Sequence, residues 1–285
     1  MIIWMAVLAP AKPDPRLNAW RDDLAAAHLR GEVAAPAYAD ATLMQVAAPV
    51  TALRRSPADG AMQDSQLLFG EMVDVYEIKN GWAWGQARHD DYVGYMLAED
   101  LAPPLEPTHK LTALRSFIYR DADIKSRPLC GISFGAQVSV AAREGHFVAL
   151  ESGGYLYAAH AAPVDVFETQ ALDVARRFIG APYFWGGREA TGLDCSALVQ
   201  LALSACGQAC PRDSDMQWAT LGQTVETPEA GDLVFWKGHV GFMSYGGKVL
   251  HANAHHMAVV EEDFAAARVR IAAAYGDILG FKRLA

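Results

Sequence analysis

The segment LDCSALVQLALSACG, residues 193–207, predicts a helix that is apolar on nearly every side and therefore buried at the centre of a domain. Asp194 is a typical N-cap residue and Gly207 a typical helix end, so we expect the helix over residues 195–206. Cys195 then lies in the first turn, where unpaired backbone N–H groups and the helix dipole favour a negative charge. Such an environment lowers the pKa of a thiol and makes it nucleophilic, whereas packing is the alternative role for a small buried Cys.

Further helical and extended segments surround this helix in the second half of the chain. A helical pattern covers residues 166–179, and a late strand is expected over residues 280–284. Three strand-like runs lie between them, LVFW (233–236), HVGFMSY (239–245) and KVLHAN (248–253). Together these elements predict an α+β domain over residues 166–285.

The loop between the last two runs decides whether two histidines share a face of the sheet. A two-residue Gly-Gly turn would place His251 on the opposite face from His239, because side chains alternate along a strand. A three-residue loop, residues 245–247, would instead pair Gly241 with His251 and bring both imidazoles to one face. A two-histidine site requires the second register.

The first half of the chain is β-rich and broken by turn sequences. Short alternating strands with turns such as Asn80-Gly81 predict a small all-β barrel over residues 33–104. The Pro-rich APPLEP (102–107) predicts a stiff linker, and further strand-like runs predict a second small barrel over residues 105–165. An amphipathic pattern over residues 15–31 predicts a short N-terminal helix within residues 1–32.

Composition identifies a globular protein and excludes several classes of function. Of the 285 residues, 52% are hydrophobic and 20% are charged, which provides enough apolar surface for packed cores. The 24 Lys and Arg residues are scattered among 33 Asp and Glu residues, giving a net charge of −9, so no nucleic-acid partner is expected. No run approaches the ~18 apolar residues of a membrane helix, so no membrane insertion is expected.

Cysteine usage and the first residues bear on the cellular compartment. The four cysteines Cys130, Cys195, Cys206 and Cys210 are too few for a disulfide framework, which favours a reducing compartment. The apolar run over residues 1–10 lacks a basic n-region and a clear cleavage site. We expect a cytoplasmic protein, with a periplasmic or secreted one as the alternative if this run is a remnant signal.

Five short motifs carry a family resemblance, and they occur in the order PYFWGG (182–187), LDCSALV (193–199), GDLVFW (231–236), GHVGF (238–242) and HAN (251–253). Together they resemble the NlpC-type cysteine peptidases, papain-like enzymes that cut bacterial cell-wall peptides. The resemblance covers residues 166–285 and keeps the order of one Cys followed by two His. It implies a papain-like catalytic domain after two small SH3-like β-barrels.

The resemblance also implies roles for four residues. Cys195 is the nucleophile, and His239 is the general base that takes its proton and later returns it to the leaving amine. His251 is the third member, which orients His239, and Tyr183 matches a family tyrosine near the oxyanion site. Covalent thiol catalysis needs no metal and no cofactor, and no ligand cluster in the sequence suggests either.

The subset of this family with bacterial SH3-like domains implies a substrate. Its members recognise murein tripeptides or tetrapeptides with a free N-terminal L-Ala and cut the γ-D-glutamyl to diamino-acid bond. By this resemblance Asp194 counters the ammonium group and Ser196 adds a hydrogen bond. The segment PRDS (211–214) places Arg212 and Ser214 at the substrate, with an ordinary loop cap as the alternative.

The first barrel is expected to send two more residues to the substrate. LLFGEMV (67–73) and DDYVGY (90–95) resemble the places from which that subset contributes a Glu and a Tyr, which are Glu71 and Tyr92 here. A carboxylate that binds the amine would reject peptides whose alanine is still linked to muramic acid. This makes recycling of released peptides the expected role, although a solvated turn Glu and a core Tyr are the plainer alternatives.

Two other functions stay open. One is a cell-wall binding protein with an inactive catalytic domain, and the other is a papain-like amidase or acyltransferase. The intact Cys, His, His order favours a peptidase over both. Neither the preferred diamino acid, nor the peptide length, nor the oligomeric state follows from the sequence.

Overall fold

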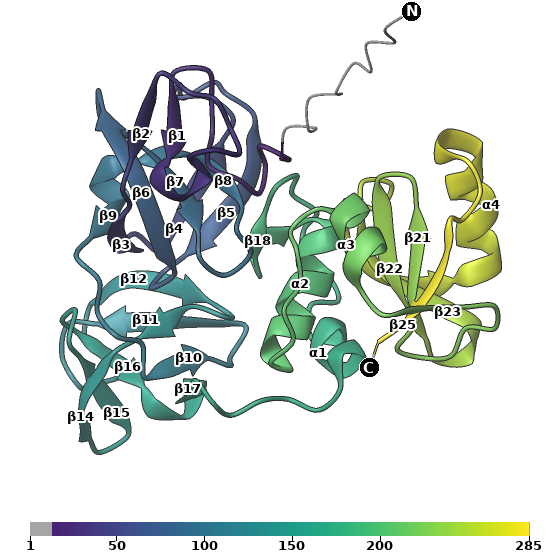
Figure 1. The fold of residues 1–285 in the computed structure, drawn as a ribbon. Helices are drawn as coiled ribbons and strands as arrows, with labels where there is room; N and C mark the ends of the chain where they lie inside the picture. Colours follow the sequence, from purple (N-terminus) through teal and green to yellow (C-terminus); the bar gives the residue numbers. More distant parts are fainter. Residues whose placement is uncertain (1–12, 285) are drawn as a thin grey trace, which may run out of the picture.

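The computed structural model describes residues 13–284, so the apolar run over residues 1–10 lies outside the described residues. Two β-rich units lie on one side of the molecule and an α+β domain lies on the other (Figure 1). Between them runs helix α2 (Cys195–Ala205), which confirms the helix predicted over residues 195–206. The architecture is therefore the mixed α+β arrangement that the sequence predicts.

The first β unit is one curved sheet of seven strands in the order β5-β4-β8-β7-β6-β3-β9. Its strands are β3 (Thr42–Val46), β4 (Val50–Arg54), β5 (Gln63–Leu68), β6 (Met72–Lys79), β7 (Trp82–Ala87), β8 (Val93–Leu97) and β9 (Leu101–Ala102), with a 3-10 turn η2 (Ala98–Asp100). Asn80 and Gly81 both have positive φ, 52° and 82°, and form the tight turn between β6 and β7 that the sequence predicts.

The predicted N-terminal helix over residues 15–31 is wrong. This segment contains a short strand, β1 (Leu24–Ala26), and a 3-10 turn, η1 (Ala27–Leu29). Strand β1 pairs in parallel with β2 (Ala37–Ala39), so its apolar residues are buried in an extended chain. They pack around Trp84 of the first barrel, and this tertiary contact outweighs the local helical pattern.

The second β unit contains a three-stranded sheet, β13-β10-β17, and a five-stranded sheet, β12-β11-β16-β15-β14. The strands are β10 (His109–Leu111), β11 (Arg115–Tyr119), β12 (Pro128–Ser133), β13 (Gln137–Val138), β14 (Val140–Glu144), β15 (Phe147–Leu150), β16 (Tyr155–Tyr157) and β17 (Ala161–Pro163), with a 3-10 turn η3 (Ala158–His160). Its small core forms around Ile118, Ile132 and Leu156.

The α+β domain is built on a six-stranded sheet in the order β20-β25-β21-β22-β23-β24. The sheet contains β20 (Gln223–Val225), β21 (Leu233–Trp236), β22 (His239–Ser244), β23 (Lys248–Asn253), β24 (Ala258–Asp263) and β25 (Gly280–Arg283). The other elements are α1 (Ala171–Arg176), α3 (Ser214–Thr220), α4 (Phe264–Tyr275) and the short pair β18 (Arg188–Glu189) and β19 (Gly192–Leu193). Within residues 13–284 no helix is long and apolar enough to cross a membrane.

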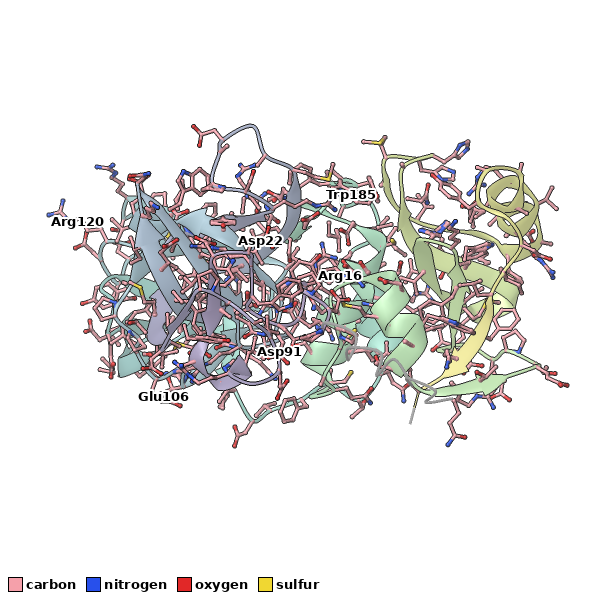
Figure 2. The ribbon with its side chains drawn as sticks, turned by 45° about the horizontal axis from the view of Figure 1, so that its top comes forward. Arg16, Asp22, Asp91, Glu106, Arg120 and Trp185 are labelled. Carbon is pink, nitrogen blue, oxygen red and sulfur yellow. The ribbon has the colours of Figure 1, made fainter. Side chains whose placement is uncertain are left out.

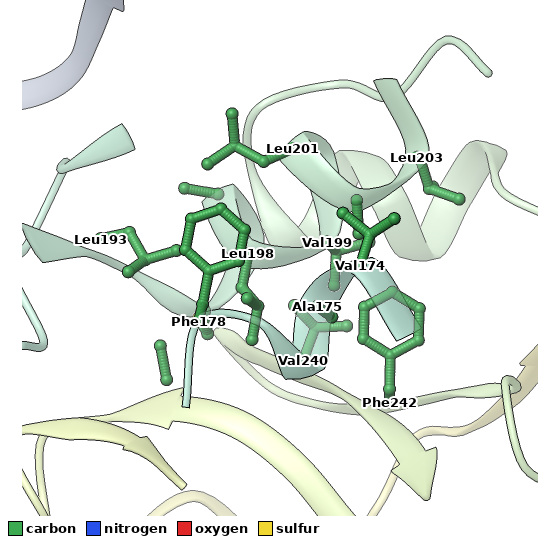
Figure 3. Packing of buried hydrophobic residues seen from close by; sticks show 14 of the residues in the cluster. Val174, Ala175, Phe178, Leu193, Leu198, Val199, Leu201, Leu203, Val240 and Phe242 are labelled. Carbon is green, nitrogen blue, oxygen red and sulfur yellow. The ribbon is translucent and has the colours of Figure 1, made fainter. Parts of the chain in front are cut away.

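Helix α2 is held between α1 and the sheet, against β22 and β23 (Figure 3). Leu198 and Val199 belong to one buried cluster with Phe178 and Phe242, so apolar side chains surround the helix as its sequence predicts. The predicted helix over residues 166–179 is shorter than expected, because it begins only at Ala171. This packing fixes the helix whose first residue is Cys195.

The hairpin between β22 and β23 has the register that a two-histidine site requires. Ser244 pairs with Lys248 and Phe242 with Leu250, which leaves the three-residue loop η4 (Tyr245–Gly247) between the strands. The two glycines of this loop have φ of 67° and 72°, a left-handed conformation that glycine adopts without strain. The three-residue loop predicted from the sequence is therefore confirmed.

Candidate active site

Cys195 is the first residue of α2, and Asp194 caps the helix. Asp194 accepts a hydrogen bond from the backbone N–H of Ala197 at 2.9 Å, which satisfies one of the free donors of the first turn. The thiol of Cys195 is only 8% exposed and lies against the backbone N–H of Val240, at the start of β22. The fold thereby places the sulfur beside the residue that follows His239.

The two histidines lie on neighbouring strands and contact each other. His239 begins β22 and His251 lies in β23, and His239 Nε2 is 2.8 Å from His251 Nδ1. His251 is completely buried, and the Trp236 ring packs beside His239 with centroids 5.6 Å apart. Because Nε2 of His239 contacts His251, Nδ1 is the other ring nitrogen through which His239 can exchange a proton.

Burial determines the resting protonation of this pair. Burial, assisted by the charge of Asp194, raises the pKa of the Cys195 thiol to about 12. Burial also lowers the pKa of His239 to about 3. Both shifts run against the expectation that the helix N-terminus lowers the thiol pKa, and they favour a neutral thiol and a neutral imidazole.

Tyr183 lies close enough to Cys195 for its hydroxyl to sense the charge of the sulfur. Burial, and after it the charges of Cys195 and Asp194, raises the pKa of Tyr183 well above its ordinary value, so the hydroxyl stays a hydrogen-bond donor. The backbone N–H of Tyr183 donates to Met257 at 2.9 Å. This position suits a donor to a developing oxyanion.

Arg212 is buried at the base of the site and joins two predicted substrate residues. It is 1% exposed, and its Nη1 and Nη2 donate to the two oxygens of Asp194 at 3.0 and 2.6 Å. Nη1 also donates to Ser196 Oγ at 2.9 Å, and Nε donates to Ser65 Oγ of the first barrel at 2.9 Å. Asp194, Ser196 and Arg212 therefore come together as predicted, but as a packed network.

This network engages the carboxylate of Asp194, for which the family resemblance implies a role as the partner of an ammonium group. Its Oδ1 accepts from Ser196 Oγ, Ala197 N and Arg212, and its Oδ2 accepts from Gly186 N at 3.0 Å and again from Arg212. The carboxylate is 7% exposed. With its lone pairs engaged, Asp194 supports the loop and helix around Cys195.

Glu71, which the family resemblance assigns to the substrate amine, is also bound by other side chains of the protein. It is buried, and its carboxylate forms a two-pronged ion pair with Arg188 at 2.8 and 3.0 Å while accepting from Leu68 N at 2.8 Å. Burial opposes ionisation, but the charges of Arg188 and His89 hold the pKa of Glu71 below its usual range. Glu71 thus links the first barrel to β18, and both oxygens of its carboxylate are engaged by Arg188.

Tyr92 does reach the α+β domain. Its hydroxyl donates to Asp213 Oδ2 at 3.0 Å, and Arg16 Nη1 donates to the same oxygen at 2.9 Å. Asp213 directly precedes Ser214. Ser214, which the sequence predicts at the substrate, is the first residue of α3, and its side chain is partly exposed. Arg16 lies between the first barrel and the helices of the α+β domain (Figure 2).

Asp213 and Arg16 were missed by sequence reasoning. Asp213 lies inside the PRDS segment, between Arg212 and Ser214, which the sequence predicts at the substrate. Its position in this motif is therefore a signal that could have identified it. Arg16 gave no signal, because 197 residues separate it from its partner.

Two further charged residues behind His251 were also missed. His251 Nε2 is 2.8 Å from Glu262 Oε1, and Arg270 donates to both oxygens of Glu262 at 2.7 and 2.6 Å. Glu262 lies on β24 beside an adjacent acidic residue, Glu261. The sequence could not tell which of these two glutamates faces the histidines, because that depends on the strand register.

Two regions of the chain match known families. Residues 53–101 match the bacterial dipeptidyl-peptidase Sh3 domain, and residues 180–271 match the NlpC/P60 family. The first match lies in the first barrel, and the second includes Cys195 and both histidines.

Individual proteins extend these matches. A Bacillus subtilis (strain 168) protein named gamma-D-glutamyl-L-lysine dipeptidyl-peptidase is 31% identical over 214 residues, 66% of this chain and 71% of that protein. A probable endopeptidase of Corynebacterium glutamicum is 42% identical over 100 residues, 33% of this chain and 47% of that protein, so the chain spans about half its length.

The fold has a solved counterpart. The crystal structure of an NlpC/P60 family protein from Bacillus cereus ATCC 10987 has a TM-score of 0.73 over 85% of this chain and 99% of that chain, at 18% identity. The folds are thus alike beyond the catalytic domain. The extent of the Bacillus subtilis match, more than two thirds of that relative, shows that the chain belongs to the NlpC/P60 family and is a cysteine peptidase.

Proposed function

We propose that this peptidase hydrolyses the γ-D-glutamyl to diamino-acid bond of murein tripeptides or tetrapeptides that carry a free N-terminal L-Ala. We further propose that it works in the cytoplasm on peptides released from the cell wall, and that its second β unit is also an SH3-like module. The name of the Bacillus subtilis relative supports the bond, since that protein is a gamma-D-glutamyl-L-lysine dipeptidyl-peptidase.

The preference for a free amine is supported by the site at Asp213, whose carboxylate accepts a hydrogen bond from Tyr92. Arg16 faces three carboxylates, those of Asp14, Asp213 and Asp215, so negative charge is in excess there. Both hydrogen bonds to Asp213 reach Oδ2, which leaves Oδ1 to accept from an ammonium group. A charge-assisted hydrogen bond of this kind favours a free amine over an amide-linked alanine.

The reaction follows from the resting state of the site. Cys195 transfers its proton to Nδ1 of His239 as the sulfur attacks the γ-carbonyl carbon, and Tyr183 donates a hydrogen bond to the resulting oxyanion. The protonated His239 then gives that proton to the leaving amine of the diamino acid. Water, deprotonated by His239, hydrolyses the thioester and releases L-Ala-γ-D-Glu.

Mass spectrometry of the products tests this function. Pure protein is incubated with L-Ala-γ-D-Glu-meso-diaminopimelate and, separately, with the same peptide N-acetylated, with Cys195→Ala as the control. We expect L-Ala-γ-D-Glu from the free peptide alone and none from the control variant, because the thioester requires the sulfur.

Two other results of this experiment would reject parts of the proposed function. Equal cleavage of both peptides would keep the peptidase and remove the amine specificity and the recycling role. Cleavage of neither would favour a wall-binding protein with an inactive domain, or an amidase or acyltransferase.

A further inference from the structure

The chain of buried side chains behind the base has a single consistent arrangement of protons. His251 is completely buried, and its two ring nitrogens contact His239 on one side and Glu262 on the other, each at 2.8 Å. Arg270 donates two charge-assisted hydrogen bonds to the two oxygens of Glu262. Glu262 is 17% exposed in its side chain, so water competes little for its oxygens.

Glu262 can only accept hydrogen bonds in this arrangement. Burial opposes its ionisation, but hydrogen bonds from His251 and Arg270 outweigh burial and hold the pKa of Glu262 far below its usual range. An ionised carboxylate has no proton to donate, so the hydrogen between Glu262 and His251 belongs to Nε2 of His251.

The position of that proton sets the rest of the chain. A neutral imidazole carries one N–H, so with Nε2 protonated, Nδ1 of His251 is an acceptor. The hydrogen between the two histidines therefore belongs to Nε2 of His239. His239 is left with a lone pair on Nδ1, the nitrogen that remains to take the Cys195 proton.

We propose that Glu262, held in place by Arg270, is a positioning residue that fixes the tautomers of His251 and His239 and stabilises the imidazolium formed during catalysis. The proposal rests on the proposed roles of Cys195 and His239 in peptide cleavage. Glu262 touches neither the substrate nor the reacting atoms and acts through His251.

The surroundings of the histidines do not supply a substitute for Glu262. Besides Glu262 itself, the charged and titratable groups that act on them are Arg270 of α4 and His256 of the loop before β24. Among these groups only Glu262 is a carboxylate. Replacing it leaves the positive charge of Arg270 facing the histidines without a counter-charge.

The adjacent residue on β24 provides a matched control. Glu261 is equally shielded, with its side chain 16% exposed, but it accepts from Ser244 Oγ at 2.6 Å and pairs with Arg176 and Lys248 at 3.6 Å. It has no contact with either histidine. Glu261→Gln therefore removes the same charge from the same strand without touching the chain of histidines.

The experiment compares wild type, Glu262→Gln, Glu262→Asp, Arg270→Met and Glu261→Gln, with folding checked by circular dichroism and thermal unfolding. For Glu262→Gln we expect kcat to fall about 10- to 100-fold, by analogy with the loss seen when the carboxylate partner of a metal-ligating histidine is removed, with KM within about two-fold. Glu262→Asp should recover part of the loss, and Glu261→Gln should match wild type.

The pH dependence separates this role from a merely structural one. Loss of the anion in Glu262→Gln makes the imidazoles harder to protonate, so the profile of kcat/KM moves to lower pH. Loss of the cation in Arg270→Met makes them easier to protonate, so the profile moves to higher pH. A defect of packing alone would not produce opposite shifts.

Nitrogen-15 NMR of the histidine rings tests the proposal without any substrate. In wild type, His239 and His251 should both be Nε2–H tautomers, whereas in Glu262→Gln they should become mixtures, because an amide can donate as well as accept. Mixed tautomers in wild type, or a kcat of Glu262→Gln equal to that of Glu261→Gln, would overturn the proposal. Failure of wild type to cleave peptide with the tautomers as expected would instead reject the proposed function.

Discussion

At the scale of single residues, a burial pattern separates groups that hold the site together from groups that meet a ligand. Asp194 and Arg212 are almost fully buried and saturate each other. Asp213 is different, because its side chain is 26% exposed and its Oδ1 accepts no hydrogen bond from residues 13–284. The residue to change when probing specificity is therefore Asp213.

Asp213→Asn should raise KM for the free-amine murein peptide about 10-fold or more, because a hydrogen bond to a charged group contributes about 1.5–3 kcal/mol. The folded state should change little, since Asp213 makes no side-chain capping bond to α3. Steady-state kinetics on the free and N-acetylated peptides measure the effect.

Asp215→Asn is the control for this substitution. Asp215 binds the same Arg16 but is 62% exposed and lies two residues further along the chain, in the first turn of α3. Equal increases of KM in both variants would show that Asp213 acts only as part of the general negative charge.

At the scale of elements, the hairpin of β22 and β23 is the device that brings the histidines together. Gly241 lies between them in this hairpin, and a Cβ there would be 3.0 Å from the Cβ of His251, from the carbonyl oxygen of Leu250 and from Cγ2 of Val249. The absence of a side chain at this position thus lets the two strands approach.

Gly241→Ala should lower the melting temperature and reduce kcat several-fold, because the neighbouring strand must give by a few tenths of an ångström and the position of His251 shifts with it. Thermal unfolding and kinetics measure the two effects.

Gly85→Ala in β7 is the matched control. A Cβ there would lie 2.8 Å from the carbonyl oxygen of Asp74, so the site is at least as crowded but lies in the first barrel. We expect a comparable loss of stability with kcat retained. If both variants lose kcat equally, the close approach at Gly241 has no special role.

Many of the elements of the α+β domain could be predicted from the sequence. The features that could not be predicted depend on contacts between distant parts of the chain. The length and ends of α2 and the hairpin register followed from Asp194, Gly207 and the two loop glycines, because helix caps and turns are local. The pKa of Cys195 was predicted in the wrong direction, because burial is a property of the whole fold. Residues 15–31 have helical spacing, but the surface of the first barrel selects an extended chain.

At the scale of the whole molecule, the first barrel and the α+β domain share buried charges. Glu71 pairs with Arg188, and Asp90 of the barrel accepts from Gln200 of α2 at 2.8 Å and pairs with His89 at 3.0 Å. The pairing of Glu71 with Arg188 could not be predicted from the sequence, because 117 residues separate them. Partners that are distant in the sequence therefore determine which carboxylates are already bound within the protein and which can still bind a ligand.

Glu71→Gln should destabilise the protein by about 3–5 kcal/mol, the usual cost of removing one partner of a buried ion pair. Chemical denaturation measures the change. Asp74→Asn is the control, because its partner Arg88 is 52% exposed and such surface pairs contribute at most about 1 kcal/mol. Similar values for both variants would show that the interface pair adds nothing beyond a surface pair.

The same carboxylates make the stability depend on pH. Burial opposes the ionisation of Glu71 and Asp90, yet the neighbouring Arg188 and His89 leave both pKa values below their ordinary range. Their contribution is therefore complete above about pH 4–5 and is lost as the pH falls further, when protons bind preferentially to the unfolded chain. The melting temperature of wild type should fall more steeply between about pH 5 and 3 than that of Glu71→Gln.

The hydrogen bonds that cross from the first barrel to the α+β domain limit which parts of the chain can be exchanged between relatives. Arg188 and Arg212 belong to the α+β domain, but Gln66 O, Glu71 and Ser65 Oγ of the first barrel satisfy part of their donors. A shortened gene encoding only residues 166–285 would leave two arginines with unmatched N–H groups and would also lack Tyr92. Recombination that exchanges this barrel between relatives would therefore need to carry these acceptors with it.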